Sequence, residues 1–180
     1  MAKRRPGATQ AQDNDQTEDA ENYFDTDQQE IDKLKLGIFA EGEKVVVQID
    51  NCSIQPTKAN DKLGLLCFLQ GDDNYRTIVH WTDVSFMSNK FSKGRPLSEL
   101  VNGKENLIDL LWAASSKMTL GEALKKGSQA LLDELQGKLL KVECKVGEYE
   151  GSETNSVRGM EQVTADDDIP DNLDTTDLPF

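Results

Sequence analysis

The chain has 180 residues, of which 37% are hydrophobic, and a formal net charge of −13. This length fits one or two domains, and the apolar content suffices for one moderate core. No apolar run reaches the roughly 18–20 residues that cross a bilayer, and no apolar stretch follows the basic residues 3–5, so we expect neither a membrane span nor a secretory signal peptide.

The charge is distributed unevenly along the chain. Residues 1–30 carry 3 basic and 8 acidic side chains, residues 31–160 carry 17 and 18, and residues 161–180 carry 7 acidic side chains and no Lys or Arg. The net charges are therefore −5, −1 and −7. A near-neutral middle between two acidic ends does not exclude a nucleic-acid partner, because the average charge hides the distribution.

Residues 1–30 are predicted to form a disordered arm, because Gln, Asp, Asn, Glu and Thr dominate them and bury too little apolar surface to offset ordering. Tyr23 and Phe24 are the only aromatic residues of this arm. The folded domain is expected over residues 31–163. It opens with residues 31–39, which fit a short helical turn or an edge strand.

Three segments in the first half of this domain are predicted to be β-strands. Residues 43–57 alternate apolar and polar side chains, and residues 64–70 form a short apolar run between glycines, which is typical of a central strand. Residues 75–86 are rich in β-branched and aromatic side chains. On this third strand, the residues at even spacing from Ile78 are predicted to face the core. Trp81, at an odd spacing from Ile78, is then on the opposite face, at or near the surface.

The middle of the domain is predicted to be helical. Residues 104–116 have apolar side chains at helical spacing, and Trp112 lies in that stripe, so we expect it in the core. Thr119 and Glu122 form a capping-box pattern that opens a second helix, which Gly137 is placed to end. The residues of this second helix expected to face the core are Leu124, Leu131 and Leu135.

Two further strands complete the domain. Residues 139–149 alternate at period two, and residues 157–163 form a short fifth strand after a turn. Three strands, a helical stretch and two strands are the order of an OB-fold, a five-stranded barrel with its helical insertion between strands three and four. An α+β sheet with helices on one side is the competing fold, because strand order cannot be read from one sequence.

The sequence carries no motif of an enzyme. It lacks the phosphate-binding, nucleophile-elbow and HExxH patterns, and His80, the single histidine, is expected to be a partly buried, hydrogen-bonded strand residue. Cys52, Cys67 and Cys144 form no CxxC pair and are expected to be buried, reduced thiols of a cytoplasmic protein. We therefore expect no catalytic residues, no cofactor and no metal. A metal-dependent nuclease that uses carboxylates such as Asp72 is a further functional hypothesis, and no motif supports it.

The pattern favours binding of single-stranded nucleic acid. Such binding uses aromatic faces on which bases stack and cations that follow the phosphates. Both kinds of side chain occur together on the third and fourth predicted strands and in the loops beside them. The predicted nucleic-acid-binding residues are Lys58, Lys62, Tyr75, Arg76, Trp81, Lys90, Phe91, Lys93, Arg95, Lys141, Lys145 and Tyr149.

The C-terminus is the most specific feature of the sequence. An acidic segment, predicted to be disordered over residues 164–180, ends in Leu-Pro-Phe. The last side chain suits an apolar pocket, and its free carboxylate suits an Arg or Lys of a partner. The predicted partner-binding residues are Asp166, Asp167, Asp168, Ile169, Pro170, Asp177, Leu178, Pro179 and Phe180.

This tail resembles the acidic tip of bacterial single-stranded DNA-binding proteins, which ends in Asp-Asp-Asp-Ile-Pro-Phe. The chain splits that tip into partial copies at residues 166–170 and 177–180, with Leu in place of Ile in the second copy. Residues 43–163 are similar in pattern to phage-encoded OB-fold single-stranded DNA-binding proteins, through the strand at 75–86, the helical insertion and the segment from Leu135 to the Gly turn after Tyr149.

The resemblance implies a protein that coats single-stranded DNA during phage DNA replication or recombination. It also implies a tail that lies over the basic groove without DNA and, once displaced, recruits replication or recombination proteins. The alternative is an acidic DNA mimic that inhibits a host DNA-processing protein, although residues 31–160 are nearly neutral rather than acidic. The sequence leaves the oligomeric state open.

Overall fold

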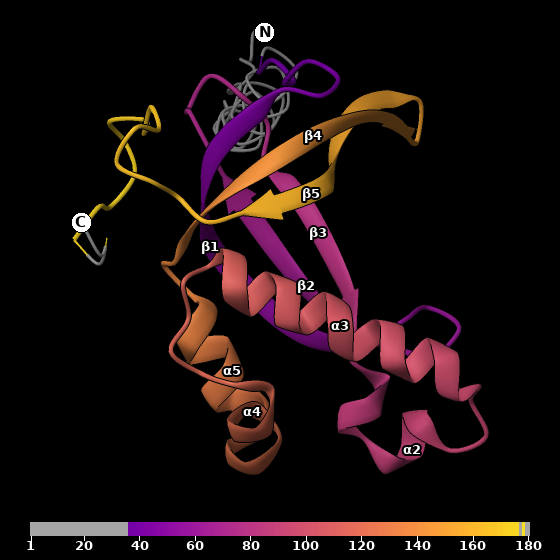
Figure 1. Cartoon of the computed structure of the whole chain (residues 1–180). Helices are drawn as coiled ribbons and strands as arrows, with labels where there is room; N and C mark the ends of the chain where they lie inside the picture. Colours follow the sequence, from indigo (N-terminus) through magenta and orange to yellow (C-terminus); the bar gives the residue numbers. More distant parts are fainter. Residues whose placement is uncertain (1–35, 177, 179–180) are drawn as a thin grey trace, which may run out of the picture. The chain divides into compact units, whose positions relative to one another are not determined.

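The computed structural model describes residues 36–176 and 178, and these form an antiparallel sheet with a few helices (Figure 1). The fold is mainly β, as predicted. The five strands lie in the order β3-β2-β1-β4-β5, and the sheet is not closed, because β3 and β5 are its edges. The strands are β1 (Lys44–Pro56), β2 (Leu63–Gln70), β3 (Ile78–Asp83), β4 (Leu139–Tyr149) and β5 (Ser152–Glu161).

The long central strand β1 organises the sheet by pairing with both β2 and β4. Val47 and Ile49 alternate into the core, as predicted from their spacing. A bulge between Ile49 and Asn51 shifts by one residue which side chains of the strand face the core. The next side chain to face the core is therefore Cys52, opposite the buried Cys67 of β2. The bulge therefore lets one strand contribute to the core along both halves.

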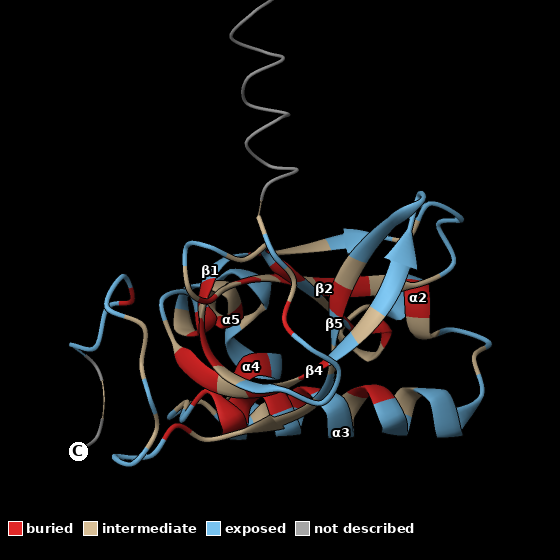
Figure 2. Ribbon diagram, turned by 90° about the horizontal axis from the view of Figure 1, so that it is seen from above, coloured by how far each residue is buried: buried red, intermediate tan, exposed pale blue. Residues whose placement is uncertain are grey.

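The helices lie between β3 and β4, where the sequence predicts them. They are η1 (Ser85–Met87, a 3-10 turn), α2 (Asn89–Ser92), α3 (Leu97–Ala113), α4 (Leu120–Lys126) and α5 (Ser128–Leu135). The buried residues of α3, which include Leu107, Leu110 and Leu111, face the sheet, and Figure 2 shows this helix buried on one side and exposed on the other. None of the described helices is long and apolar enough to cross a membrane.

The predicted capping box is confirmed, since the Thr119 side chain accepts from the Glu122 amide and the Glu122 carboxylate accepts from the Thr119 amide. The single helix predicted after it is wrong. Gly127 has φ of 88°, a conformation that favours glycine, and it separates α4 from α5. Of the leucines predicted to face the core, Leu131 and Leu135 are buried, whereas Leu124 is exposed.

Two predicted strands differ from the observed ones. The third is shorter, because Tyr75 forms only an isolated bridge with Gly37 and residues 85–87 turn into η1. The fifth begins at Ser152, five residues earlier than predicted, and pairs with β4 through a tight hairpin. The helix predicted over residues 104–116 corresponds to α3, which is longer than predicted. It begins directly after Pro96, a residue that suits a helix start.

The structure also differs from the expected disordered tail. Residues 164–176 and 178 belong to the compact unit Gly37–Phe180, which extends past the expected domain end at residue 163. The expected arm, residues 1–30, and residues 177, 179 and 180 lie outside the described residues. The tail contributes to a second, smaller apolar cluster on the outer side of the sheet, made of Val46, Leu139, Val163 and Leu173, with Ile169 and Leu178 packed against it.

Candidate nucleic-acid interface

Apolar and aromatic side chains gather on the outer face of β2 and β3. On β2 the odd-numbered residues point into the core, so Leu66 and Phe68 point away from it. The strand register places Leu66 opposite Trp81 and Phe68 opposite Val79. We call these four outward residues the aromatic face. Phe68 was not predicted, because the continuous apolar run of β2 gives no sign of which side is exposed.

Trp81 occupies the surface position that its parity predicts, with 43% of the residue exposed. Its indole lies over Gly64 of β2, where an added Cβ would come within 1.9 Å of the indole Nε1. Any side chain at position 64 would therefore displace the ring. The absence of a side chain at Gly64 therefore leaves the space that the indole of Trp81 occupies beside β2.

Cations lie at one end of the aromatic face, and a hairpin lies at the other. Lys58 is exposed and Lys62 is half-buried in the turn that leads into β2. Beyond the other end of β2, the Arg76 guanidinium donates to the Glu153 carbonyl at 3.0 Å and ties the segment before β3 to the β4–β5 hairpin. That hairpin presents Tyr149, which is 60% exposed, and the exposed Lys145.

Two of the predicted aromatic residues do not join this surface, which corrects their prediction. Tyr75 stacks on Phe39, with ring centroids 4.1 Å apart and planes at 10°, and packs against the main core. Phe91 lies in α2 with only 8% of the residue exposed, and the exposed Lys90 ammonium lies 4.8 Å from its ring centroid. Both rings are used in packing, so neither offers a face to a base.

Arg95 is also corrected, from a phosphate-binding residue to a structural one. Its guanidinium donates to Asp83 at 2.8 Å and to the Ser85 hydroxyl at 2.7 Å, and it also pairs with Glu99. Burial alone would raise the pKa of Asp83, but hydrogen bonds from Ser85 and Arg95 outweigh it and hold that pKa below its usual value. Lys93, two residues earlier, stays exposed.

Replacing Arg95 by alanine is expected to lower the free energy of unfolding by about 1–3 kcal/mol, because Asp83 and Ser85 lose a partly buried partner. Urea unfolding measures this loss, and Lys93→Ala, an exposed cation of the same loop, is the matched control. Affinity for single-stranded DNA is expected to stay within about twofold of the wild-type value. Weaker DNA binding with unchanged stability would return Arg95 to the interface.

Lys141 does not form part of an open cationic groove, because an acidic residue of the tail pairs with its ammonium group. Its ammonium lies 2.8 Å from the Asp167 carboxylate and 3.5 Å from that of Glu161. Hydrogen bonds from Lys141, then from Thr164, lower the pKa of Asp167 to about 2, so this carboxyl is ionised at neutral pH. Further along the tail, the Asn172 amide donates to the Gly71 carbonyl at 2.9 Å, beyond the end of β2.

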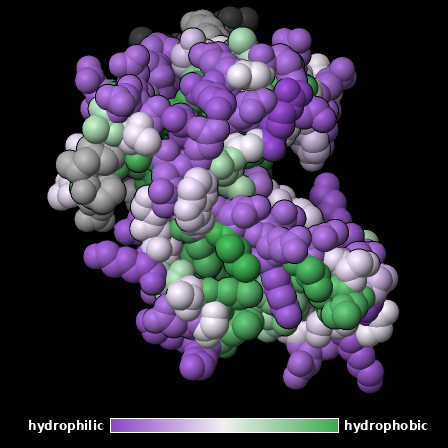
Figure 3. Space-filling view, viewed as in Figure 1, coloured by the Kyte–Doolittle hydropathy of each residue, from purple (hydrophilic) through white to green (hydrophobic). Residues whose placement is uncertain are grey.

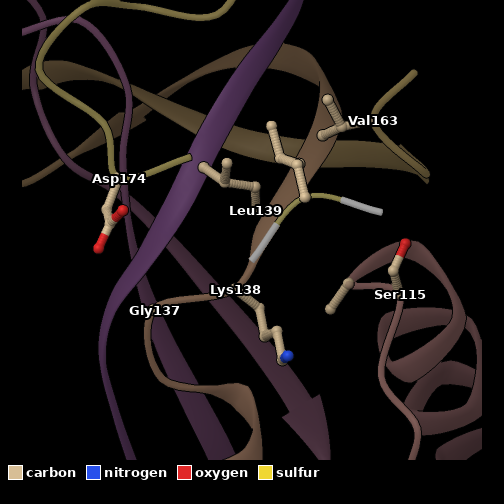
Figure 4. A pocket seen from close by; sticks show the side chains of 8 residues that line it. Ser115, Gly137, Lys138, Leu139, Val163 and Asp174 are labelled. Carbon is tan, nitrogen blue, oxygen red and sulfur yellow. The ribbon is translucent and has the colours of Figure 1, made fainter. Parts of the chain in front are cut away.

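A small cavity of about 30 Å³ lies where the tail meets the domain. Figure 4 shows Ser115 after α3, Lys138 and Leu139 at the start of β4, and Asp174 of the tail around it. Leu178 also lines this cavity. The described tail is therefore seated on the outer side of β1 and β4, on the Val46 cluster and beside Lys141.

Trp112 is not a core residue, and its prediction is wrong. The residue is 56% exposed on α3, and Ile108, one turn earlier, is 47% exposed. In Figure 3 hydrophobic side chains gather on the lower part of the molecule, where α3 and the shorter helices lie, whereas the part around the β4–β5 hairpin is hydrophilic. Trp112 borders an apolar groove of about 450 Å³ on this side, together with Ile108, Met118 and Leu120.

A second groove, of about 510 Å³, lies on the other side of Trp112. It is bounded by α3 and by the free edges of β3 and β5, and Trp81 also lines it. His80 borders this groove, with its Nε2 3.0 Å from the Thr82 hydroxyl, and burial lowers its pKa. The prediction of a partly buried, hydrogen-bonded histidine is confirmed.

The three cysteines are free and buried, as predicted. Burial raises the pKa of the Cys67 thiol to about 12 and that of Cys144 to about 11, so both remain protonated at neutral pH. Within residues 36–176 and 178, no three His, Cys, Asp or Glu side chains are grouped to hold a metal ion.

No protein-family model matches the chain, and no curated protein matches it either.

Proposed function

We propose that this chain is a non-enzymatic single-stranded DNA-binding protein of phage DNA replication or recombination, acting in the host cytoplasm. The observation that carries the proposal is the aromatic face, where Phe68 and Trp81 lie outward on adjacent strands beside the lysine-bearing turn. Bases stack on such side chains with little dependence on sequence, because every base has a π-face. Lysines beside the face supply charge for the phosphates.

The strand connections support an OB-fold as the finer description of the sheet. The helices lie between β3 and β4, and the edge strands β3 and β5 contact each other although they are not paired in the sheet. In the OB-fold, oligonucleotides lie on the face of strands two and three, between the loops that join strands one and two and strands four and five. The aromatic face lies on those two strands, and Lys58 and Lys62 lie in the first of those loops. Lys145 and Tyr149 lie on β4, before the second loop.

The seated tail supports the regulatory part of the proposal. Asp167 holds Lys141, and Asn172 reaches the end of β2, so the tail shares the outer side of the sheet with the aromatic face. Its carboxylates compete with phosphates for cations, and bound DNA releases the segment. The released acidic tip, which ends in Leu-Pro-Phe, then docks on replication or recombination proteins.

A fluorescence titration of the full chain tests this function. The two tryptophans are followed while single-stranded oligonucleotides of increasing length are added at low and high salt, with duplex DNA and RNA in parallel. We expect quenching by single strands, weakened by salt and nearly independent of sequence. If neither the full chain nor a chain lacking residues 166–180 binds at low salt, the proposal fails and an inhibitor that mimics DNA becomes the better explanation.

A further inference from the structure

The groove between α3 and the edges of β3 and β5 brings together the only two tryptophans of the chain, and we call it the two-tryptophan groove. Trp81 reaches it from β3 and Trp112 from α3, and both are substantially exposed. Its volume of about 510 Å³ lies within the range of about 300–1,000 Å³ that is typical of small-molecule sites. Trp81 belongs to the aromatic face as well, so the groove and that face share this residue.

The polar side chains of this groove suit an uncharged ring with hydrogen-bonding edges. Asn106 and Asp109 of α3 line the groove and are exposed, and neither side chain has a hydrogen-bond or ion-pair partner among the described residues. Arg158, from β5, is already paired with Glu41 and Glu143. An unpaired carboxylate and a neutralised guanidinium disfavour a phosphate in the groove, whereas an amide and a carboxylate can bind the edge of a base.

We infer that the two-tryptophan groove holds one unstacked nucleobase of the bound strand, with its ring against Trp112 and its edge at Asn106 and Asp109. This inference rests on the proposed function, and it adds a binding position beyond the face of β2 and β3. A carboxylate accepts hydrogen bonds from the exocyclic amine of cytosine, and thymine has no exocyclic amine. The groove therefore gives an otherwise sequence-tolerant protein a preference for cytosine over thymine.

The test compares binding of labelled oligo-dC and oligo-dT of equal length to the full chain and its variants. Trp112→Ala is expected to lower the affinity for oligo-dC by roughly 5- to 150-fold, which is the usual effect of losing one base–aromatic stack. Ile108→Ala is the matched control, because Ile108 is similarly exposed on α3 but does not line the groove. Its affinity is expected to equal that of the wild type.

Two further variants separate direct contact from an effect on folding. In Trp81→Phe, Trp112 is the only tryptophan left, and its emission is expected to be quenched by oligo-dC. In Asp109→Asn, the dC-to-dT affinity ratio is expected to fall toward one.

Unchanged binding by Trp112→Ala, equal losses in Trp112→Ala and Ile108→Ala, or no preference for dC in the wild type would overturn the inference. Phe68→Ala distinguishes these failures from failure of the proposed function, since Phe68 does not line the groove. If the wild type binds and Phe68→Ala weakens binding while Trp112→Ala does not, only the inference is lost. If the wild type binds no single strand, both are lost.

Discussion

Replacing Phe68 and Trp81 together by alanine is expected to lower the affinity for single-stranded DNA by at least about 30-fold. Each aromatic side chain contributes roughly 1–3 kcal/mol through one stacked base, so two losses amount to about 2 kcal/mol or more. The two residues lie on the outer face of adjacent strands and leave the buried side of the sheet unchanged. Fluorescence anisotropy with a labelled oligonucleotide measures the effect.

The control for this double variant is Leu124→Ala, which removes an exposed apolar side chain from α4, away from the aromatic face. Its DNA affinity is expected to match that of the wild type. Circular dichroism and urea unfolding show whether the double variant keeps its fold. A folded double variant that binds as tightly as the wild type would remove the aromatic face from the binding surface.

Deleting residues 166–180 is expected to raise the affinity for single-stranded DNA at low salt by roughly 5- to 150-fold. The range is that of a coupling free energy between two competing binding events, here tail docking and DNA binding. The deletion removes six carboxylates, among them Asp167, and leaves Lys141 paired with Glu161 only. Salt screens the contacts of both the tail and the DNA, so the difference between the two chains is expected to shrink at high salt.

A pair of point variants identifies the contact responsible. Asp167→Asn and Asp168→Asn change the charge equally, but only Asp167 pairs with Lys141, whereas Asp168 is exposed. Asp167→Asn is therefore expected to tighten DNA binding more than Asp168→Asn does. Equal effects of the two variants would mean that the tail acts through its total charge alone. Weaker binding after the deletion would contradict competition by the tail.

Positions that depend on local periodicity were predictable from the sequence. The alternation over residues 139–149 corresponds to β4 without a shift in its ends, and the parity of the third strand correctly placed Trp81 outside. The capping box at Thr119 was also predictable, because both of its hydrogen bonds lie within four residues. Such features require information only from neighbouring residues.

Contacts between distant segments account for the predictions that failed. Phe91 was predicted to be free because its loop carries cations, yet it packs into the domain. Arg95 pairs with Asp83, which is twelve residues away in the chain, and Lys141 pairs with Asp167, which is 26 residues away. Trp112 follows the apolar spacing of a core residue, but α3 turns its Leu107 side to the sheet and leaves Trp112 outside.

The sequence by itself determined the order of strands and helices, the acidic ends and the alternation that exposes Trp81, because charge and periodicity are properties of short stretches. Only the tertiary structure decided which side of the continuous apolar strand β2 carries Phe68, and that the tail lies on the sheet through Asp167 and Lys141. Those outcomes depend on strand register and on pairs of residues far apart in the chain. The free energies of burial and pairing between such segments depend on contacts that form only in the folded chain, so a local sequence pattern does not predict them.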